Sequence, residues 1–239
     1  MAFDTATPAV TVALRGDEGV LAEHTEIDAR RHGELLAPGI EKVLADAGCS
    51  RTDLTGVAVG VGPGPFTGLR VGLMTARALG DALEIPVYGV CTLDILAAAV
   101  LANRELGGSA ASAARAAASG AGGVTAGGGF AVATDARRRE VYWAAYDLTG
   151  RRETEPAVDR PAEIAARLAG LAVAGQGPQL YPEQFPHALD PLLPSAAVLA
   201  ELTARLLREQ PDALLPPHPL YLRRPDAVEP TGHKSVTQA

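Results

Sequence analysis

The sequence predicts a layered α/β protein made of two similar subdomains. Three observations support this prediction: strand-like and helix-like segments alternate along the chain, each half opens with a strand that ends in an aspartate, and a hairpin follows each of those strands. Such alternation is typical of folds in which helices cover a sheet. Hydrophobic residues make up 47% of the 239 residues and charged residues 21%, a balance that excludes a disordered or fibrous chain.

The first half starts with a strand that ends at Asp4 and continues into a hairpin. Small and β-branched residues alternate at positions 9–14, and four turn-forming residues, 16–19, join them to residues 20–22. Further on, helical spacing of apolar residues alternates with glycine-bounded apolar runs that are typical of buried strands. We therefore predict helices over residues 34–47, 69–83 and 93–101 and strands over residues 57–61 and 85–90.

A tract of Ala, Gly and Ser at residues 107–129 separates the two halves, and its composition cannot bury enough apolar surface to offset the entropy of ordering it. In the second half, apolar patterning predicts strands over residues 130–134, 141–146 and 171–175, and helices over residues 161–169 and 195–209, the last with Ser195 as its N-cap. We divide the chain into an N-terminal subdomain (1–102), a flexible insert (103–129), a C-terminal subdomain (130–225) and a disordered tail (226–239).

The second half repeats the order of the first, because a strand ends at Asp135 as one does at Asp4 and a hairpin follows each. Weak duplication of this kind indicates an actin-like architecture, the fold of sugar kinases. Actin-like kinases place at these two positions the aspartate turns that hold nucleotide phosphates. Here Ala6 and Arg137 carry side chains where a phosphate needs close approach to the backbone. We therefore interpret Asp4 as a turn-capping carboxylate.

The alternative interpretation keeps Asp4, Thr5 and Asp135 as a vestigial nucleotide site. In its strongest form, the protein is an ATP-binding phosphotransferase in which Asp4 positions a metal-bound nucleotide. The three arginines at positions 137–139 could contact RNA, but a solvated hairpin tip is the favoured interpretation.

Charge, cysteine and hydrophobicity patterns exclude several classes of protein. The net charge of −7 repels a nucleic-acid backbone, and Cys49 and Cys91 form neither a disulfide framework nor a zinc motif. No HxxxH or HExxH pair occurs, so no metal site is expected. The longest apolar stretch, residues 95–102, is far shorter than the roughly 20 residues that cross a bilayer, and no secretory signal is evident. We expect a cytoplasmic protein without contact with a membrane.

The most distinctive segment is the glycine- and proline-rich turn at residues 60–70, where a strand ends and a helix begins. Such places often bind phosphate. This segment matches neither the dinucleotide nor the Walker pattern, and Pro63 and Pro65 remove two backbone donors. We favour a rigid turn that sets the helix against the sheet, with Thr67 as its cap. An anion site or a partner site is the alternative.

Two predicted helices carry features that suit either a core or an interface. Small residues recur every four positions along one of them, at Gly68, Gly72, Ala76 and Gly80. Interior glycine costs a helix about 1 kcal/mol relative to alanine, so another helix should approach closely enough to offset that cost. The spacing does not decide whether that helix belongs to this chain or to a partner. The other helix carries an apolar stripe at Leu35, Leu36, Ile40, Val43 and Leu44, for which core burial is the default and an interface the alternative.

Several of these segments resemble the TsaB (YeaZ) family. The most specific is GPGPFTGLRVG at residues 62–72, and the resemblance covers nearly the whole chain outside the Ala/Gly tract. Further matches are DTAT at 4–7, RHGELLAPGI at 31–40, IPV at 85–87, DARRREVY at 135–142 and PLYLR at 219–223. Pro65 and Gly33 stand where the family commonly has serine.

The resemblance implies the actin-like fold of sugar kinases and heat-shock ATPases, and a non-catalytic subunit of the machinery that makes threonylcarbamoyladenosine beside the anticodon of ANN-decoding tRNAs. The implied partners are TsaD, which carries out the threonylcarbamoyl transfer, and TsaE, an ATPase that docks on the TsaB–TsaD pair. The same surface also supports homodimers in the family. The resemblance implies no cofactor and no catalytic residue in this chain, and tRNA contact only through the complex.

By position, the resemblance places the partner-binding helices on two sets of residues. They are Leu35, Leu36, Ile40, Val43 and Leu44, and Gly68, Leu69, Gly72, Met74, Ala76 and Gly80. A four-helix bundle between paralogues would use the close approach that the glycines permit. On this interpretation, a bulky residue at Gly72 should block the heterodimer and leave the fold intact.

Overall fold

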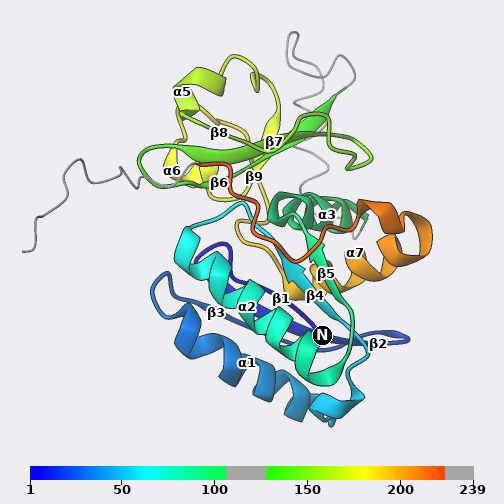
Figure 1. Ribbon diagram of the computed structural model, residues 1–239. Coiled ribbons are helices and arrows are strands. Elements are labelled where there is room, and N and C mark those ends of the chain that lie inside the picture. Colours follow the sequence, from blue (N-terminus) through cyan, green and yellow to red (C-terminus); the bar gives the residue numbers. More distant parts are fainter. Residues whose placement is uncertain (106–127, 224–239) are drawn as a thin grey trace, which may run out of the picture.

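The computed structural model describes residues 1–105 and 128–223, and these residues form two sheets, one from each half of the chain (Figure 1). Most of the predicted insert, residues 106–127, and the predicted tail lie outside the described residues. Residues 103–105 continue a helix and Gly129 begins a strand, so the ordered halves extend further toward the Ala/Gly tract than predicted. None of the helices in the described ranges is long and apolar enough to cross a membrane.

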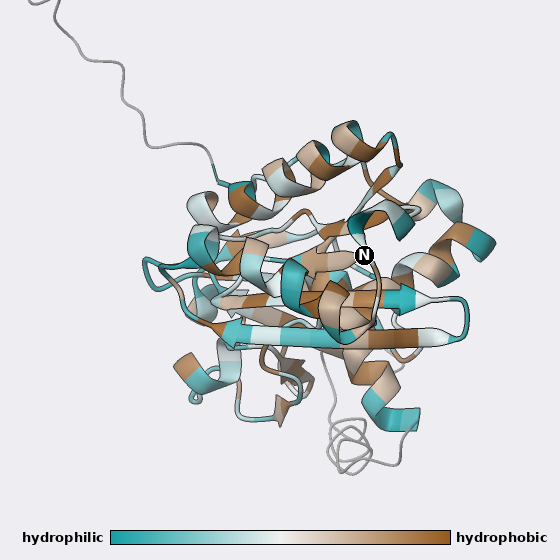
Figure 2. Ribbon diagram, turned by 90° about the horizontal axis from the view of Figure 1, so that it is seen from below, coloured by the Kyte–Doolittle hydropathy of each residue, from teal (hydrophilic) through white to brown (hydrophobic). Residues whose placement is uncertain are grey.

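The first sheet has the order β3-β2-β1-β4-β5. Its strands are β1 (Ala2–Asp4), β2 (Ala9–Gly16), β3 (Gly19–Ile27), β4 (Val57–Gly60) and β5 (Val87–Val90). Strand β1 pairs antiparallel with β2 and parallel with β4. The predicted hairpin is confirmed, although β3 runs five residues beyond the predicted 20–22. Residues 23–26 of this edge strand are polar and mostly exposed, and the ribbon has hydrophilic colour there in Figure 2. Without apolar residues at these positions, no pattern in the sequence indicated that the strand continues.

The second sheet has the order β10-β9-β6-β7-β8, which repeats the arrangement of the first sheet when it is read from the β8 edge. Its strands are β6 (Gly129–Asp135), β7 (Val141–Asp147), β8 (Ala157–Asp159), β9 (Ala172–Ala174) and β10 (Ala188–Leu189). Strand β6 pairs antiparallel with β7 and parallel with β9, as β1 pairs with β2 and β4. The predicted duplication and the α/β fold class are therefore confirmed.

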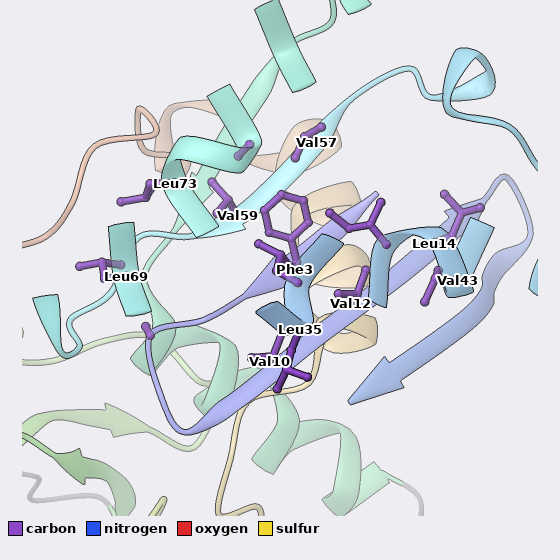
Figure 3. Close-up of a cluster of buried hydrophobic side chains, with 14 of the residues drawn as sticks. Phe3, Val10, Val12, Leu14, Leu35, Val43, Val57, Val59, Leu69 and Leu73 are labelled. Atoms are coloured by element: carbon purple, nitrogen blue, oxygen red, sulfur yellow. The ribbon is translucent and has the colours of Figure 1, made fainter. Parts of the chain in front are cut away.

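Helices α1 (His32–Asp46) and α2 (Phe66–Leu83) pack together on one face of the first sheet. Between them and the sheet lies a cluster of buried apolar side chains, with Phe3 beside Val12 of β2 and Val59 of β4 (Figure 3). Burying five such side chains stabilises the fold by about 8–15 kcal/mol before entropy is counted. The apolar stripe of α1 thus lies in the core, as the default interpretation of the sequence expected.

Two other helices each pack on the sheet that the other half of the chain forms. Helix α7 (Ala196–Glu209) packs on β1 and β2 of the first sheet, and α3 (Thr92–Glu105) packs on β6 and β7 of the second. In the first case Leu199 joins Ala2 and Ala58 in one buried cluster. Helix α7 lies within the predicted C-terminal subdomain, 130–225, and packs on the first sheet. Helical periodicity in the sequence identifies its apolar face but not the sheet that covers this face.

The structure confirms one predicted helix cap and corrects another. The Ser195 hydroxyl accepts a hydrogen bond from the Val198 backbone N–H at 3.3 Å, as an N-cap should. Thr67 is not a cap, because α2 already begins at Phe66 with Pro65 at the N-cap position and no side-chain cap. The helix predicted over residues 161–169 is a single turn, α5 (Pro161–Ile164). The remaining short helical elements of the described residues are η1 (Arg51–Asp53), α6 (Gly177–Leu180) and η2 (Pro211–Ala213).

Candidate functional site

Asp4 ends β1 in a fully buried position. One carboxylate oxygen accepts a hydrogen bond from the Ala6 backbone N–H at 2.7 Å, and the other accepts one from the Thr92 hydroxyl at 2.6 Å. The predicted turn-capping role is thus confirmed, and Thr92, at the start of α3, was not foreseen as the second partner. Burial raises the pKa of Asp4 above its ordinary value, although both hydrogen bonds act to lower it.

A glycine closes the remaining approach to this carboxylate. A Cβ built on Gly60 would lie 1.7 Å from the Asp4 Oδ2 atom, so only glycine fits beside it. In this arrangement the Asp4 carboxylate is closed to solvent. The phosphotransferase alternative, in which Asp4 positions a metal-bound nucleotide, would require this turn to open.

Thr5 contacts the face of α2 that carries the regularly spaced glycines. Its hydroxyl donates to the Gly68 carbonyl at 2.8 Å and accepts from the Gly72 N–H at 3.0 Å. A Cβ on Gly72 would lie 2.5 Å from the Thr5 hydroxyl oxygen, and one on Gly80 would lie 2.4 Å from a methyl carbon of Val87. The glycine face therefore packs mainly on the β1–β2 turn and β5 of its own chain, and at Gly68 it also meets His32, the first residue of α1. Contrary to the prediction for Gly72, a bulky residue there would disturb the fold itself.

Asp135 ends β6, but its surroundings differ from those of Asp4. It is half-buried, accepts a hydrogen bond from the Arg137 N–H at 2.8 Å and pairs with the Arg137 guanidinium at 3.2 Å. Arg137, Arg138 and Arg139 have φ angles of 61°, 56° and 62°. Such left-handed backbone costs a non-glycine residue roughly 1–2 kcal/mol. Thr5 and Arg137 line one cavity of about 340 Å³, whereas Asp4 lies outside its lining.

The residues that the resemblance assigns to partner binding lie mostly inside the chain. All but Leu44 and Met74 are buried, and Leu36, Val43, Leu69 and Ala76 have exposures of 0–1%. Direct contact between these four and a partner is excluded in this arrangement, because they already fill the core under the sheet. Met74 differs, since 61% of its surface is exposed in the middle of α2.

The outer surface of the α1–α2 pair is carried by residues that sequence reasoning did not select. Ala37 on α1 and Ala78 on α2 are exposed, and Val71 and Thr75 are half-buried. These side chains are small or of moderate size, and exposed charged residues stand on the same helices, Glu41 and Lys42 on α1 and Arg70 and Arg77 on α2. A helix that approaches the pair therefore meets both small and charged side chains. Their exposed positions follow from the helical period once the buried stripe is known, which is the signal that could have identified them.

Sequence reasoning also missed the role of the C-terminal segment, residues 214–223. Leu215 forms a two-way backbone bridge with Gly89 of edge strand β5, at 2.7 and 2.9 Å, and the Leu220 N–H donates to the Val61 carbonyl at 2.8 Å. Arg223 pairs with Glu140 and donates to the Ala136 carbonyl at 3.2 Å. The segment thus contacts both subdomains. The PLYLR motif was its only signal in the sequence.

Known proteins resemble this chain over nearly its whole length. The Escherichia coli protein named tRNA threonylcarbamoyladenosine biosynthesis protein TsaB is 33% identical, with 93% of this chain and 94% of that protein aligned. An uncharacterized protein of Mycobacterium tuberculosis is 44% identical, with 95% of this chain and 92% of that protein aligned. A family model described as TsaD, tRNA N6-adenosine threonylcarbamoyltransferase, matches residues 19–117.

Among solved structures, YeaZ from Pseudomonas aeruginosa superposes with a TM-score of 0.71 at 32% identity, covering 92% of this chain and 98% of that one. Two sheets of the same order, each opening with an aspartate turn, define this chain as an α/β protein of the actin-like class. In this case the first aspartate is enclosed by its own chain. The similarity to the Escherichia coli protein over the full length gives the particular family: the chain belongs to the TsaB (YeaZ) family.

Proposed function

We propose that this chain is a non-catalytic scaffold subunit in the biosynthesis of tRNA threonylcarbamoyladenosine. It pairs with TsaD and supports transfer of the threonylcarbamoyl group to the adenosine next to the anticodon of ANN-decoding tRNAs. The support is full-length similarity to a protein whose name states this biosynthesis. TsaE docks on the pair, the chain contacts tRNA only through the complex, and the assembly works in the cytoplasm.

The enclosed Asp4 carboxylate is the observation that carries the non-catalytic role. A general base, a nucleophile or a metal ligand must reach the reacting atoms, and both Asp4 oxygens are occupied by Ala6 and Thr92 of the same chain. Among the described residues, His, Cys, Asp and Glu side chains nowhere gather in groups of three that could hold a metal ion. In this proposal the Asp4 turn has a structural role and holds β1 against the start of α3.

The outer surface of α1 and α2 is the proposed contact with TsaD. The TsaD family model matches residues 19–117, a range that includes both helices, so this chain and TsaD are related in this region. Related chains can pair through equivalent surfaces about a pseudo-two-fold axis, and a homodimer is the corresponding alternative for the isolated chain. Met74 lies at the middle of α2 with a flexible, exposed side chain suited to such a contact. The buried stripe and glycines hold these helices in place.

Size-exclusion chromatography with TsaD from the same genome, combined with an assay of threonylcarbamoyladenosine formation, tests the proposal. We expect a stable complex and formation that depends on this chain. Met74→Arg should weaken association by at least about 30-fold, the effect of losing an interface hot spot. Leu207→Arg is the matched control, because Leu207 is 41% exposed on α7. Unchanged association of Met74→Arg, or an equal loss with Leu207→Arg, would exclude this surface, and formation without the chain would exclude the scaffold role.

A further inference from the structure

A cavity of about 420 Å³ lies between the two subdomains. Its walls come from the turn before α2 and the first residue of that helix, from the β6–β7 hairpin and from the C-terminal segment. The side chains that matter here are Phe66, Tyr142, Tyr221, Arg137, Arg138 and Arg223. Asp4, Thr5 and Asp135 do not line it, so it is not the predicted nucleotide site.

One wall presents a fixed pair of aromatic rings. Phe66 and Tyr221 are stacked with centroids 5.3 Å apart, and 47% and 41% of their respective surfaces are exposed. The Arg70 guanidinium lies 3.5 Å from the centroid of Phe66, and its Nε donates to the Tyr221 hydroxyl at 3.0 Å. The rings are thus held in place before any ligand arrives. Exposed, immobilised aromatic rings are suited to stacking on a flat apolar group.

The positively charged side chains of the cavity come from the hairpin tip and the C-terminal segment. Arg137, Arg138 and Arg223 line the cavity, although the chain as a whole has a net charge of −7. Asp135 and Glu140 pair with Arg137 and Arg223 and orient them. A guanidinium has five N–H donors, so an ion pair leaves it able to bind a further anion.

The backbone of the hairpin tip supports a role for these side chains beyond closing a turn. Glycine would adopt the left-handed conformation of residues 137–139 without strain, yet the chain has arginine at all three positions. Strained backbone of this kind concentrates at binding and catalytic sites, where the surrounding structure maintains it. Here the hairpin is closed by hydrogen bonds between Ala136 and Glu140 and between Glu140 and Arg137, each 3.0 Å long.

We propose that this cavity binds a small aromatic anion, a single flat ring that carries a carboxylate or a phosphate ester. The ring stacks on the Phe66–Tyr221 pair and the anionic group binds the guanidinium groups of Arg137 and Arg138. A mostly apolar cavity with a few charged groups is the usual form of a small-molecule site, and 420 Å³ is near the lower end of the 300–1,000 Å³ typical of such sites. The proposal does not depend on pairing with TsaD.

Isothermal titration of the full-length chain with four probes separates the contributions of ring and charge. Phenyl phosphate and benzoate carry both, inorganic phosphate lacks the ring, and phenol lacks the charge. We expect at least one of the two aromatic anions to bind with a Kd of about 1 mM or below, and both single-feature probes to bind at least about tenfold more weakly. The tighter aromatic anion identifies the anionic group. Absence of binding by both aromatic anions overturns the proposal, as does equal affinity for inorganic phosphate or phenol.

Matched variants place the binding in this cavity. Arg137→Gly and Arg139→Gly make the same backbone change, but only Arg137 lines the cavity. We expect Arg137→Gly to lower the affinity for the aromatic anion by about tenfold and Arg139→Gly to leave that affinity unchanged. Tyr221→Ala should weaken binding and Tyr221→Phe should retain it, because the ring is kept. Thermal melts establish that each variant is folded. Equal weakening in Arg137→Gly and Arg139→Gly, or full affinity in both Arg137→Gly and Tyr221→Ala, contradicts the proposed site.

Discussion

Asp4 and Asp135 end the first strands of two sheets with the same strand order, and their surroundings are opposite in kind. Asp4 is fully buried, and both of its oxygens accept hydrogen bonds from its own chain. Asp135 is half-buried and faces a hairpin tip of exposed arginines. The same position in a duplicated fold therefore serves internal packing in one half and remains accessible in the other.

The cause of the difference lies in the residues that meet each turn. Gly60, the last residue of β4, and Gly64, in the turn that follows, allow the backbone to approach the first turn. A Cβ on Gly60 would lie 1.7 Å from the Asp4 carboxylate, and one on Gly64 would lie 2.2 Å from the Ala6 carbonyl oxygen. At the second turn, three consecutive residues with long side chains adopt left-handed backbone. A duplicated topology thus gives no guarantee of a duplicated function, because the contacts of each turn come from other parts of the chain.

The largest effect should come from opening the first turn. Gly60→Ala places a methyl group onto the Asp4 carboxylate, and we expect it to lower the free energy of unfolding by about 3 kcal/mol or more, through overpacking and loss of buried hydrogen bonds. Urea denaturation measures this. Gly33→Ala is the matched control, since nothing lies within 4 Å of the Cβ it would add. A loss at Gly60 no larger than at Gly33 would show that the first turn is not tightly packed.

A smaller effect concerns pH. The raised pKa of Asp4 means that the folded state favours the protonated carboxyl, so this contribution to stability is full below the unfolded pKa near 3.8 and is lost as pH rises through the folded pKa. Asp4→Asn cannot ionise, and its amide can still accept from Ala6 and donate to the Thr92 hydroxyl. The variant should therefore gain stability relative to the natural chain between pH 4 and pH 8.

Denaturant titrations at several pH values measure this gain. Asp135→Asn makes the same chemical change at the accessible turn and tests whether burial is the cause. A stability difference between Asp4→Asn and the natural chain that stays constant with pH would contradict the assigned direction of the pKa shift.

The smallest effect should come from the second turn. Arg139→Gly relieves left-handed backbone, and the gain of roughly 1–2 kcal/mol is partly offset by the greater entropy of glycine in the unfolded chain. We expect a net stabilisation of about 0.5–1 kcal/mol, measured as an increase in the midpoint of urea denaturation. Destabilisation would show that the Arg139 side chain makes contacts that outweigh the strain.

Local patterns in the sequence were sufficient to predict most elements. The stripe of Leu36 and Val43 predicted α1, Ser195 predicted the start of α7, and the two aspartate strands predicted the duplicated sheets. These features depend on neighbours within a few positions, which is why periodicity and capping rules find them.

Contacts between distant positions could not be predicted in the same way. Gly72 meets Thr5, 67 residues away, and Asp4 meets Thr92, 88 residues away. The glycine spacing of α2 indicated a close contact but not its identity, so an interface with a partner remained open until the fold supplied the neighbour. The Phe66–Tyr221 pair gave no periodic signal at all.

The exchange of α3 and α7 has a thermodynamic consequence. Each sheet is covered by a helix from the other half of the chain, and Leu220 packs against the apolar clusters of both. If one sheet melts, the other loses part of its cover and exposes apolar surface. Neither half should therefore persist alone, and calorimetry should show a single cooperative transition with equal calorimetric and van't Hoff enthalpies.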